Sequence, residues 1–411
     1  MPEYQTPRGT FDVLPPDSGR YERLVAVFAS LVERAGYGLV ISPMFEHYEV
    51  FSRVGEATDI VRKEMYDFED KGGRHIALRP EGTASVVRAF VQHRPTTPWK
   101  AWYAAPNFRY EHAQAGRYRQ HHQLGVEALG TEDPDLDVEV ISLLAELYHH
   151  VGLTKVRLLL NSLGDNECRP AYRAMLLEYL GAHAAELCDE HRERYVDNPL
   201  RVLDCKKPPC VAVAADAPLQ VDHLCEPCTQ HFTRVRAGLD ALGVDYTLAP
   251  RLVRGLDYYT RTTFEFAAEA LDSAQNAVGG GGRYDGLAES LGGPPTPGIG
   301  FGTGIERILL ACDAEGVFAT SPARVEVFVM DTTGGETARD VTADLRSAGI
   351  STDRSFDNRS WKAQMKAAQR SGARLAIAIE PDGIQLRTLT EKGEPEPVER
   401  ATIVDHVRKR L

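Results

Sequence analysis

Residues Asn107–Glu127 read NFRYEHAQAGRYRQHHQLGVE, the stretch that does most to decide the fold of this 411-residue chain. A strand enters at Phe108–Glu111, a loop containing Gly116 turns the chain round, and a second strand leaves through Gln123 and Glu127. Because side chains alternate between the two faces of a strand, Gln123 and Glu127 are expected on the same face. The sequence therefore predicts an antiparallel hairpin with polar groups on one side.

This hairpin carries groups that suit ligand binding. Arg109 on the first strand could place a guanidinium beside Gln123 and Glu127. A guanidinium fork suits phosphate, and a carboxylate suits a cationic or hydrogen-bond-donating substrate. A charged hairpin that simply faces solvent accounts for the same residues, so the hairpin alone leaves both interpretations open.

Strands separated by short loops surround the hairpin. They are predicted at Gly38–Glu46, Arg74–Arg79, Lys100–Tyr110, Gln120–Gly130, Tyr258–Ala267 and Gly298–Gly304. Helices are predicted between Asp17 and Gly36, at Gly82–His93 and at Asp135–Val151. This pattern favours an antiparallel sheet with helices packed on it, which makes the chain an α+β protein. Pro43 lacks a backbone donor, so its strand is expected at an edge or an interface.

The chain is expected to divide into three parts. Residues 1–165 and 241–318 form the core with the antiparallel sheet. Residues 166–240 hold most of the cysteines and read mainly as helices, which indicates an inserted helical domain. Residues 322–411 alternate as β-α-β-α-β, a pattern typical of a small α/β domain.

The composition limits the classes of function. The chain has 47 Lys and Arg against 59 Asp and Glu, a net charge of −12, which argues against wholesale coating of nucleic acid but leaves room for a local basic surface. No apolar run approaches the roughly 20 residues that span a bilayer. The start, MPEYQTPRGTFD, does not resemble a secretory signal, so no membrane association and a cytoplasmic location are expected.

Two further segments combine polar groups with chain turns. Glu81 and Thr83 lie at a strand end that leads into a helix, where such residues often only cap the first turn, although they could also accept hydrogen bonds from an ammonium group. Arg254 precedes Gly255 and two tyrosines, Tyr258 and Tyr259. These offer a phosphate ligand and a hydroxyl-lined pocket, or ordinary strand packing with the two rings on opposite faces.

Glycine alternates with other residues from Gly298 to Gly304, just before Arg307. One face of that strand is then bare backbone, with room for a flat ligand such as a nucleobase. Arg307 could stack on the base or reach a phosphate. The segment fits neither the GxxxxGK[ST] phosphate loop nor the GxGxxG dinucleotide pattern.

Four of the seven cysteines are paired in sequence. Cys205 and Cys210 form C-x4-C, and Cys225 and Cys228 form C-x2-C. This spacing is compatible with one structural zinc site, and four reduced thiols are the alternative.

Together these segments resemble class II aminoacyl-tRNA synthetases, and specifically histidyl-tRNA synthetases of the bacterial type, over essentially the whole chain. Motif 1 of the class resembles the helix ending at Gly36 and the strand through Pro43; motif 2 resembles Phe108–Glu127, and motif 3 resembles Gly300–Arg307. The histidine-specific signatures are Arg254–Tyr259 and Gly280–Tyr284, supported by Leu78–Thr83.

The resemblance implies an enzyme that activates L-histidine with ATP and Mg²⁺ and transfers it to the 3′ end of tRNA(His). It implies that histidine is bound by Glu81, Gly82, Thr83, Gln123, Glu127, Arg254, Tyr258 and Tyr259. It implies that ATP is bound by Arg109, Arg117 and Arg307, that Arg254, Arg109 and Arg307 are catalytic, and that Gln114 meets the tRNA acceptor end. No metal ligand is implied among these residues.

The resemblance further implies a homodimer with motif 1 at the interface and a C-terminal domain that reads the anticodon. Two positions in the motif 2 loop depart from the family pattern: His112 and Ala115 stand where relatives often carry basic residues. The competing interpretation is a regulatory, synthetase-like subunit of ATP phosphoribosyltransferase. Such a protein is expected to lose the ATP-binding arginines and the last domain, and this chain has both.

Overall fold

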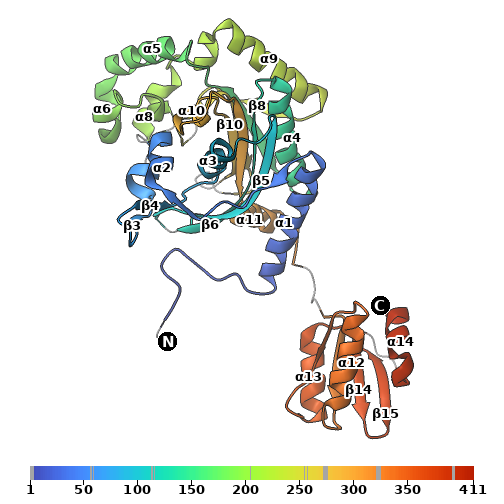
Figure 1. Ribbon diagram of the computed structural model, residues 1–411. Coiled ribbons are helices and arrows are strands. Elements are labelled where there is room, and N and C mark those ends of the chain that lie inside the picture. Colours follow the sequence, from blue (N-terminus) through green and yellow to red (C-terminus); the bar gives the residue numbers. More distant parts are fainter. Residues whose placement is uncertain are drawn as a thin grey trace. The chain divides into compact units, whose positions relative to one another are not determined.

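The computed structural model describes residues 4–55, 58, 60–112, 114, 116–203, 205–253, 255–256, 258–271, 276–320, 325–390 and 394–411 (Figure 1). The chain forms two compact units. The first consists of Met1–Val13 and Arg20–Ala319, and the second of Leu14–Gly19 and Thr320–Leu411. Among the described residues, no helix is long and apolar enough to cross a membrane.

The first unit is built on an eight-stranded sheet. Its order is β1 (Gly38–Leu39), β5 (Trp99–Phe108), β6 (Gln120–Leu129), β11 (Gly298–Gly304), β10 (Ala277–Arg283), β9 (Thr260–Ala268), β7 (Val156–Ser162) and β8 (Tyr246–Leu248). The strands of the outermost pairs, β1 with β5 and β7 with β8, run parallel, and all other neighbours are antiparallel. The predicted antiparallel sheet and the hairpin of β5 and β6 within it are confirmed.

Helices cover one face of this sheet. The main hydrophobic core joins its strands to α1 (Asp17–Arg34), α4 (Pro134–His150), α9 (Glu226–Ala241) and α11 (Ile305–Glu315). Leu124, Val126 and Ala128 of β6 point into this core, so the residues that alternate with them face the other way. On that other face α3 (Thr83–His93) packs through Val86 against Ala101 and Tyr103 of β5.

The prediction of one continuous strand over Gly38–Glu46 is wrong. The segment is divided into β1 and β2 (Phe45–His47), and β2 belongs to a separate three-stranded sheet with β4 (His75–Leu78) and β3 (Asp67–Glu69). Pro43 lies in the interruption and cannot donate to a ladder. Nearby lie α2 (Tyr48–Gly55), a π-helical turn at Ile60–Glu64 and α10 (Leu287–Ser290).

The inserted segment is helical, as predicted. It comprises α5 (Arg169–Ala182), η2 (Ala184–Glu186), α6 (Asp189–Arg194), α7 (Leu200–Leu203), α8 (Pro208–Ala215), η3 (Gln220–His223) and α9. A small cluster of eleven buried residues holds α5 to α8 together, while α9 packs on the main core. The insertion lies within the first compact unit, and its boundaries as a separate domain at residues 166–240 stay a prediction.

The second unit contains a five-stranded sheet of order β13 (Thr352–Arg354), β12 (Val327–Asp331), β14 (Leu375–Glu380), β15 (Gly383–Thr388) and β16 (Glu396–Pro397). Helices α12 (Glu336–Ser347) and α14 (Ile403–Arg410) cover one face, and α13 (Trp361–Ser371) covers the other. The β-α-β-α-β order over β12 to β14 is confirmed. The prediction did not include β15, β16 or α14, which follow the alternating part.

Candidate active site

A cavity of about 730 Å³ opens on the sheet face that carries Gln123. Residues of β6, β9, β10 and β11 line it, together with the motif 2 loop and the segment before β9. Gly302 and Gly304 of β11 lie opposite Gly125 and Gln123 of β6. A β-carbon built on Gly302 would lie 3.6 Å from the Gln123 amide, so backbone and small residues form this part of the floor.

The same face holds Glu127. Its partner across the ladder is Gly300, and a β-carbon there would lie 1.9 Å from the carboxylate of Glu127. The structure thus places Gln123 and Glu127 on one face, as the period of two predicts. The Gln123 amide oxygen accepts a hydrogen bond of 2.7 Å from the side-chain amide of Asn107, which fixes its orientation.

Among the residues that the structure describes, the cationic side chains lining the cavity are Arg109, Arg117, Lys206, Arg251 and Arg307. Arg109 donates from Nε to the Pro80 carbonyl at 2.8 Å. Arg307 donates to the carbonyls of Gly116 and Ala277 at 2.9 and 2.7 Å. Because backbone acceptors hold these guanidinium groups, they are oriented before any ligand arrives.

The electrostatic effect of this clustering is visible at His121, which also lines the cavity. Burial, together with the positive charges of Arg109 and Arg307, lowers the pKa of His121 to about 3. Burial and the neighbouring Arg117 likewise lower the pKa of Arg307. A site that disfavours additional positive charge in this way favours anionic ligands such as phosphate groups.

Arg254 and Asp257 lie outside the described residues, but their neighbours border the cavity. Arg251 and Gly255 are lining residues. Arg251 Nε donates a hydrogen bond of 2.7 Å to the Ala214 carbonyl in α8. Arg201 of α7 donates one of 2.9 Å to the Gly255 carbonyl. The inserted helices therefore hold the loop on both sides of Arg254.

Glu81 is buried and caps α3. Its two carboxylate oxygens accept hydrogen bonds from the amides of Thr83 and Ala84 at 2.6 and 2.8 Å. Burial raises the pKa of Glu81, while these amides and Arg109 oppose the shift. The capping geometry is present, and it also fixes the position of the carboxylate.

Glu127 is fully buried, and the hydroxyl of Tyr284 donates to one of its oxygens. The other oxygen has no hydrogen-bond partner within the described part of the chain. Burial raises the pKa of Glu127, and hydroxyls of Tyr284 and Thr83 oppose the shift. A buried polar atom without a partner is uncommon, and here it leaves an acceptor position for a ligand N–H.

Tyr258 and Tyr259 do not point to opposite faces, so that prediction is wrong. Strand β9 begins only at Thr260, and Tyr258 lies in a turn. The two rings are 4.7 Å apart, and the Tyr258 ring is 5.9 Å from that of Tyr284. Outside a strand the alternation of faces does not apply, which allows both rings to approach the same region.

Sequence reasoning assigned no role to Tyr103 and Tyr284. Tyr103 is buried, and β-carbons built on Gly82 and Gly125 would lie 2.4 and 2.3 Å from its ring. It lies directly opposite Gly125 in the β5–β6 ladder. The sequence signal that could have identified Tyr103 is a large residue placed opposite a glycine in the predicted hairpin.

The loop between β5 and β6 carries the remaining candidates. Gln114 is exposed and pairs through its backbone with Arg117, whose side chain lies 3.7 Å from that of Glu111. His112 is also exposed, and Ala115 lies outside the described residues. The loop thus presents Gln114 to solvent beside the cavity.

The four paired cysteines do not form one zinc site. Cys205 and Cys210 group with Cys188 and His191, whereas Cys225 and Cys228 group with Asp165 and Cys168. The first pair flanks the start of α8, and the second lies at the start of α9 beside the end of β7. The first pair belongs to the small cluster of α5 to α8, which α9 does not share. The prediction of one site from the spacing of the four cysteines is therefore wrong.

Comparisons with known proteins agree with one another. The family described as Histidyl-tRNA synthetase matches residues 9–308. The histidine–tRNA ligase of Pelotomaculum thermopropionicum is 45% identical, covering 98% of this chain and 97% of the relative. That of Anaeromyxobacter dehalogenans is 51% identical, covering 90% of each.

Solved structures extend the agreement to three dimensions. The apo histidyl-tRNA synthetase of S. aureus superposes with a TM-score of 0.83 at 36% identity, covering 98% of this chain and 100% of that one. An ATP phosphoribosyltransferase regulatory subunit/histidyl-tRNA synthetase from Bacillus halodurans reaches 0.67 at 20% identity, covering 92% and 98%. At that identity the second likeness shows the fold alone.

Proposed function

The chain belongs to the histidyl-tRNA synthetase family and ligates histidine to tRNA, and we propose that the cavity described above is where histidine reacts with ATP. The observation that carries this proposal is the fully buried Glu127, with one unpartnered oxygen, on the same sheet face as a cavity lined by arginines. The buried carboxylate suits an imidazole N–H, and the arginine-lined cavity suits a polyphosphate. Since aminoacylated tRNA supplies translation, we expect the protein in the cytoplasm.

We assign the polar residues around Glu127 to histidine. Glu127 and Tyr258 bind the imidazole, Tyr259 lines the pocket, and Gln123 contacts the amino acid beside them. Glu81, Gly82 and Thr83 bind the amino group. The support is that Glu81, Glu127 and Tyr258 influence one another electrostatically: burial and then the negative charge of Glu81 raise the pKa of Tyr258, and Glu127 adds to the shift.

We assign the arginines to ATP, which enters as its magnesium complex. Arg109 binds the α-phosphate, Arg307 lies along the nucleotide, and Arg117 contacts the outer phosphates. Arg254, which the histidine site shares, also reaches the α-phosphate. The bare backbone at Gly302 and Gly304 leaves space for the adenine, and carboxylates such as Glu265 lie on the lining where they can meet hydrated Mg²⁺.

The reaction that these groups support is an in-line attack. A histidine carboxylate oxygen bonds to the α-phosphorus of ATP, the bond from that phosphorus to the bridging oxygen breaks, and pyrophosphate leaves. A terminal ribose hydroxyl of tRNA then attacks the histidyl carbonyl carbon, the bond from that carbon to the phosphate oxygen breaks, and AMP leaves. No covalent enzyme intermediate is needed, so positioning and charge stabilisation by oriented arginines account for the chemistry.

The direct test is ATP–pyrophosphate exchange with each amino acid in turn. Exchange that depends on histidine is the expected result, because an imidazole N–H can satisfy the buried oxygen of Glu127, whereas a side chain without a donor leaves it unpaired. Exchange with another amino acid would contradict the assigned specificity. Histidine binding without any exchange would favour the regulatory alternative, which the family membership and the near-complete coverage of ligase relatives disfavour.

We propose that residues 322–411, which make up most of the second unit, bind the anticodon. Helix α13 presents Lys362, Lys366 and Arg370 to solvent at intervals of one turn. The sequence spaces Arg359, Lys362, Lys366, Arg370 and Arg374 by three or four residues, a spacing that predicts one basic stripe along a helix. The stripe is shorter than this spacing predicts, because Arg359 and Arg374 lie outside the helix. Arg359 pairs with Asp357 at 3.5 Å, and Arg374 donates to the Leu411 carbonyl at 2.6 Å.

Replacing both Lys362 and Lys366 with alanine should weaken aminoacylation and flatten its salt dependence. Each lost phosphate contact lowers the slope of log affinity against log salt by about 0.7–0.9. The measurement is tRNA binding across a salt series. Lys409→Ala is the matched control, because Lys409 is exposed on α14, which covers the face of the sheet opposite to α13. This variant should leave the slope unchanged. An unaltered slope in the double variant would show that these basic side chains face solvent and do not contact tRNA.

We also propose a homodimer and a tRNA acceptor contact at Gln114. The dimer proposal rests on the motif 1 segment, where large apolar residues are exposed: Leu39, Ile41, Met44 and Phe45. Ile41, a large apolar side chain close to Pro43 in the sequence, is 86% exposed. Contiguous exposed apolar groups of this kind mark interaction surfaces. A second copy that covers this segment would remove the exposed patch.

A further inference from the structure

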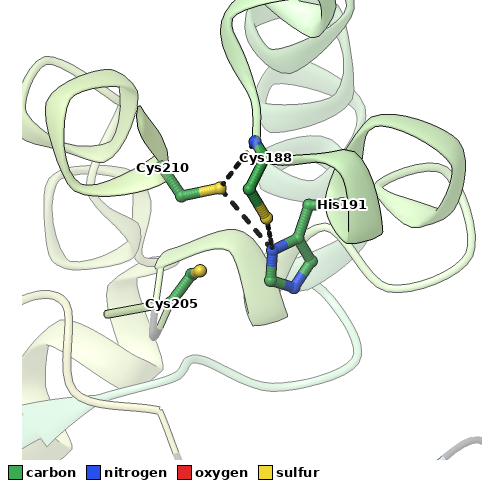
Figure 2. A group of neighbouring side chains, drawn as sticks. All are labelled: Cys188, His191, Cys205 and Cys210. Carbon is green, nitrogen blue, oxygen red and sulfur yellow. Dashed lines mark hydrogen bonds between the residues drawn. The ribbon is translucent and has the colours of Figure 1, made fainter. Parts of the chain in front are cut away.

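The insertion contains a group of side chains that the aminoacylation reaction does not use. Cys188 precedes α6, His191 lies in its first turn, Cys205 follows α7, and Cys210 lies in the first turn of α8. Their three sulfurs and one ring nitrogen of His191 all lie within 4.8 Å of one another. Figure 2 shows these four side chains converging from three separate segments.

We propose that these four residues bind a structural zinc ion. In a tetrahedral site with Zn–S near 2.3 Å and Zn–N near 2.0 Å, neighbouring ligand atoms lie about 3.5–3.8 Å apart. The Cys188 and Cys210 sulfurs are 3.3 and 3.6 Å from His191 Nδ1, so small movements bring the set to that geometry. The ligand spacings, C-x2-H and C-x4-C, are those of structural zinc sites.

The surroundings fit a metal-bound thiolate. The backbone amide of Cys188 lies 3.4 Å from the Cys210 sulfur, in position to donate to it. Lys207 lies between Cys205 and Cys210 and pairs with Glu190, next to the cluster, at 3.1 Å. A zinc ion with three thiolates carries net negative charge, so a nearby amide and ammonium group stabilise it.

The insertion also needs such a crosslink. The core of α5 to α8 consists of eleven buried residues, and α6 and α7 are only six and four residues long. Helices this short are not stable alone, so their positions depend on the packing around them and on any crosslink between them. A zinc ion joining α6, α7 and α8 would supply what the apolar packing lacks.

The zinc site would also support the active site. Leu203 and Lys206, on either side of the Cys205 segment, line the cavity. Arg201 of α7 and the Ala214 carbonyl of α8 hold the loop that carries Arg254 through hydrogen bonds of 2.9 and 2.7 Å. A zinc ion at Cys205 and Cys210 would therefore fix both helices that position this loop.

The second group, Asp165 with Cys168, Cys225 and Cys228, is a different case. Its carboxylate already accepts from the amides of Glu167 and Cys168 at 3.0 and 3.4 Å and pairs with Arg261 at 3.5 Å. We draw no inference for this group. The metal content of each variant is compared with that of the wild type, so metal bound by this group does not change the result.

The test is elemental analysis of the full-length protein, expressed with zinc and purified under reducing conditions without chelator. The wild type should contain at least about one tightly bound zinc per chain. Cys205→Ser and Cys210→Ser should each lose about one equivalent relative to the wild type. Cobalt substitution of the wild type should give intense thiolate-to-cobalt absorption, and both serine variants should show it reduced by the contribution of one site.

Cys312→Ser is the matched control, because Cys312 is buried in α11 and belongs to neither group. It should keep the metal content of the wild type. Because Cys210 is fully buried and its variant can misfold, the half-buried Cys205 provides the independent second variant. Metal content that is equal in the wild type and in Cys205→Ser, or a metal-free wild type that is folded and active, would overturn the proposal. These readouts do not depend on aminoacylation, so they stand apart from the proposed active site.

Discussion

Replacing Arg254 with alanine is expected to slow adenylate formation by about 10²–10³-fold, the typical loss for one preorganised donor at a developing charge. As the histidine carboxylate attacks, negative charge grows on the oxygens of the α-phosphorus. A guanidinium held beside them stabilises that charge without rearranging during the step. Arg251 and Gly255, on either side of Arg254, border the cavity and are hydrogen-bonded to α8 and α7.

Pyrophosphate exchange measures this loss directly. The melting temperature of the Arg254→Ala variant should stay close to that of the wild type, and its histidine affinity should fall far less than its rate of exchange. Transfer from preformed histidyl-adenylate to tRNA should be much less affected, because the α–β phosphate bond is already broken. If Arg254 instead serves a structural ion pair with Asp257, the melting temperature should fall. Near-normal exchange would remove Arg254 from the mechanism.

Replacing Glu127 with alanine should raise the KM for histidine by about 10²-fold, with a far smaller effect on the KM for ATP. Losing one partner of a buried hydrogen bond costs roughly 1–3 kcal/mol, or about 5–150-fold in affinity. Glu127 is fully buried with one unpartnered oxygen, whereas the ATP side of the cavity is lined by arginines held independently of it.

Pyrophosphate exchange at varied histidine and ATP concentrations separates these two effects. Tyr284→Phe is the matched control, since it removes only the hydroxyl that donates to the other oxygen of Glu127. It should affect histidine binding less than Glu127→Ala does. Equal losses for histidine and ATP in the Glu127 variant, together with a lower melting temperature, would indicate a folding defect in place of a specific contact.

Most of the core fold and several candidate residues could be predicted from periodicity. The alternation of Gln123 and Glu127 with Leu124 and Val126 predicts which face of β6 is polar, and the ladder with β11 bears this out. A period of two is a local property, and so it survives in the folded chain. The roles of these residues stay predictions, because geometry alone does not show which ligand they bind.

What failed depended on long-range contacts or on breaks in a regular element. The grouping of Cys188 and His191 with Cys205 and Cys210 arises from the packing of α6 to α8, and sequence spacing suggested a different set. The two adjacent tyrosines were expected on a strand, but β9 begins after them. In both cases tertiary structure decided the positions of the side chains.

The close approach of β6, β10 and β11 limits how this protein can vary. A β-carbon on Gly281 would lie 1.9 Å from the Gly300 carbonyl oxygen, and one on Gly300 would lie 2.4 Å from that of Val126. Neither obstacle is a side chain that could rotate away. Even alanine is therefore excluded at both sites, so glycine is the only residue that natural variation can leave there while the sheet keeps its spacing.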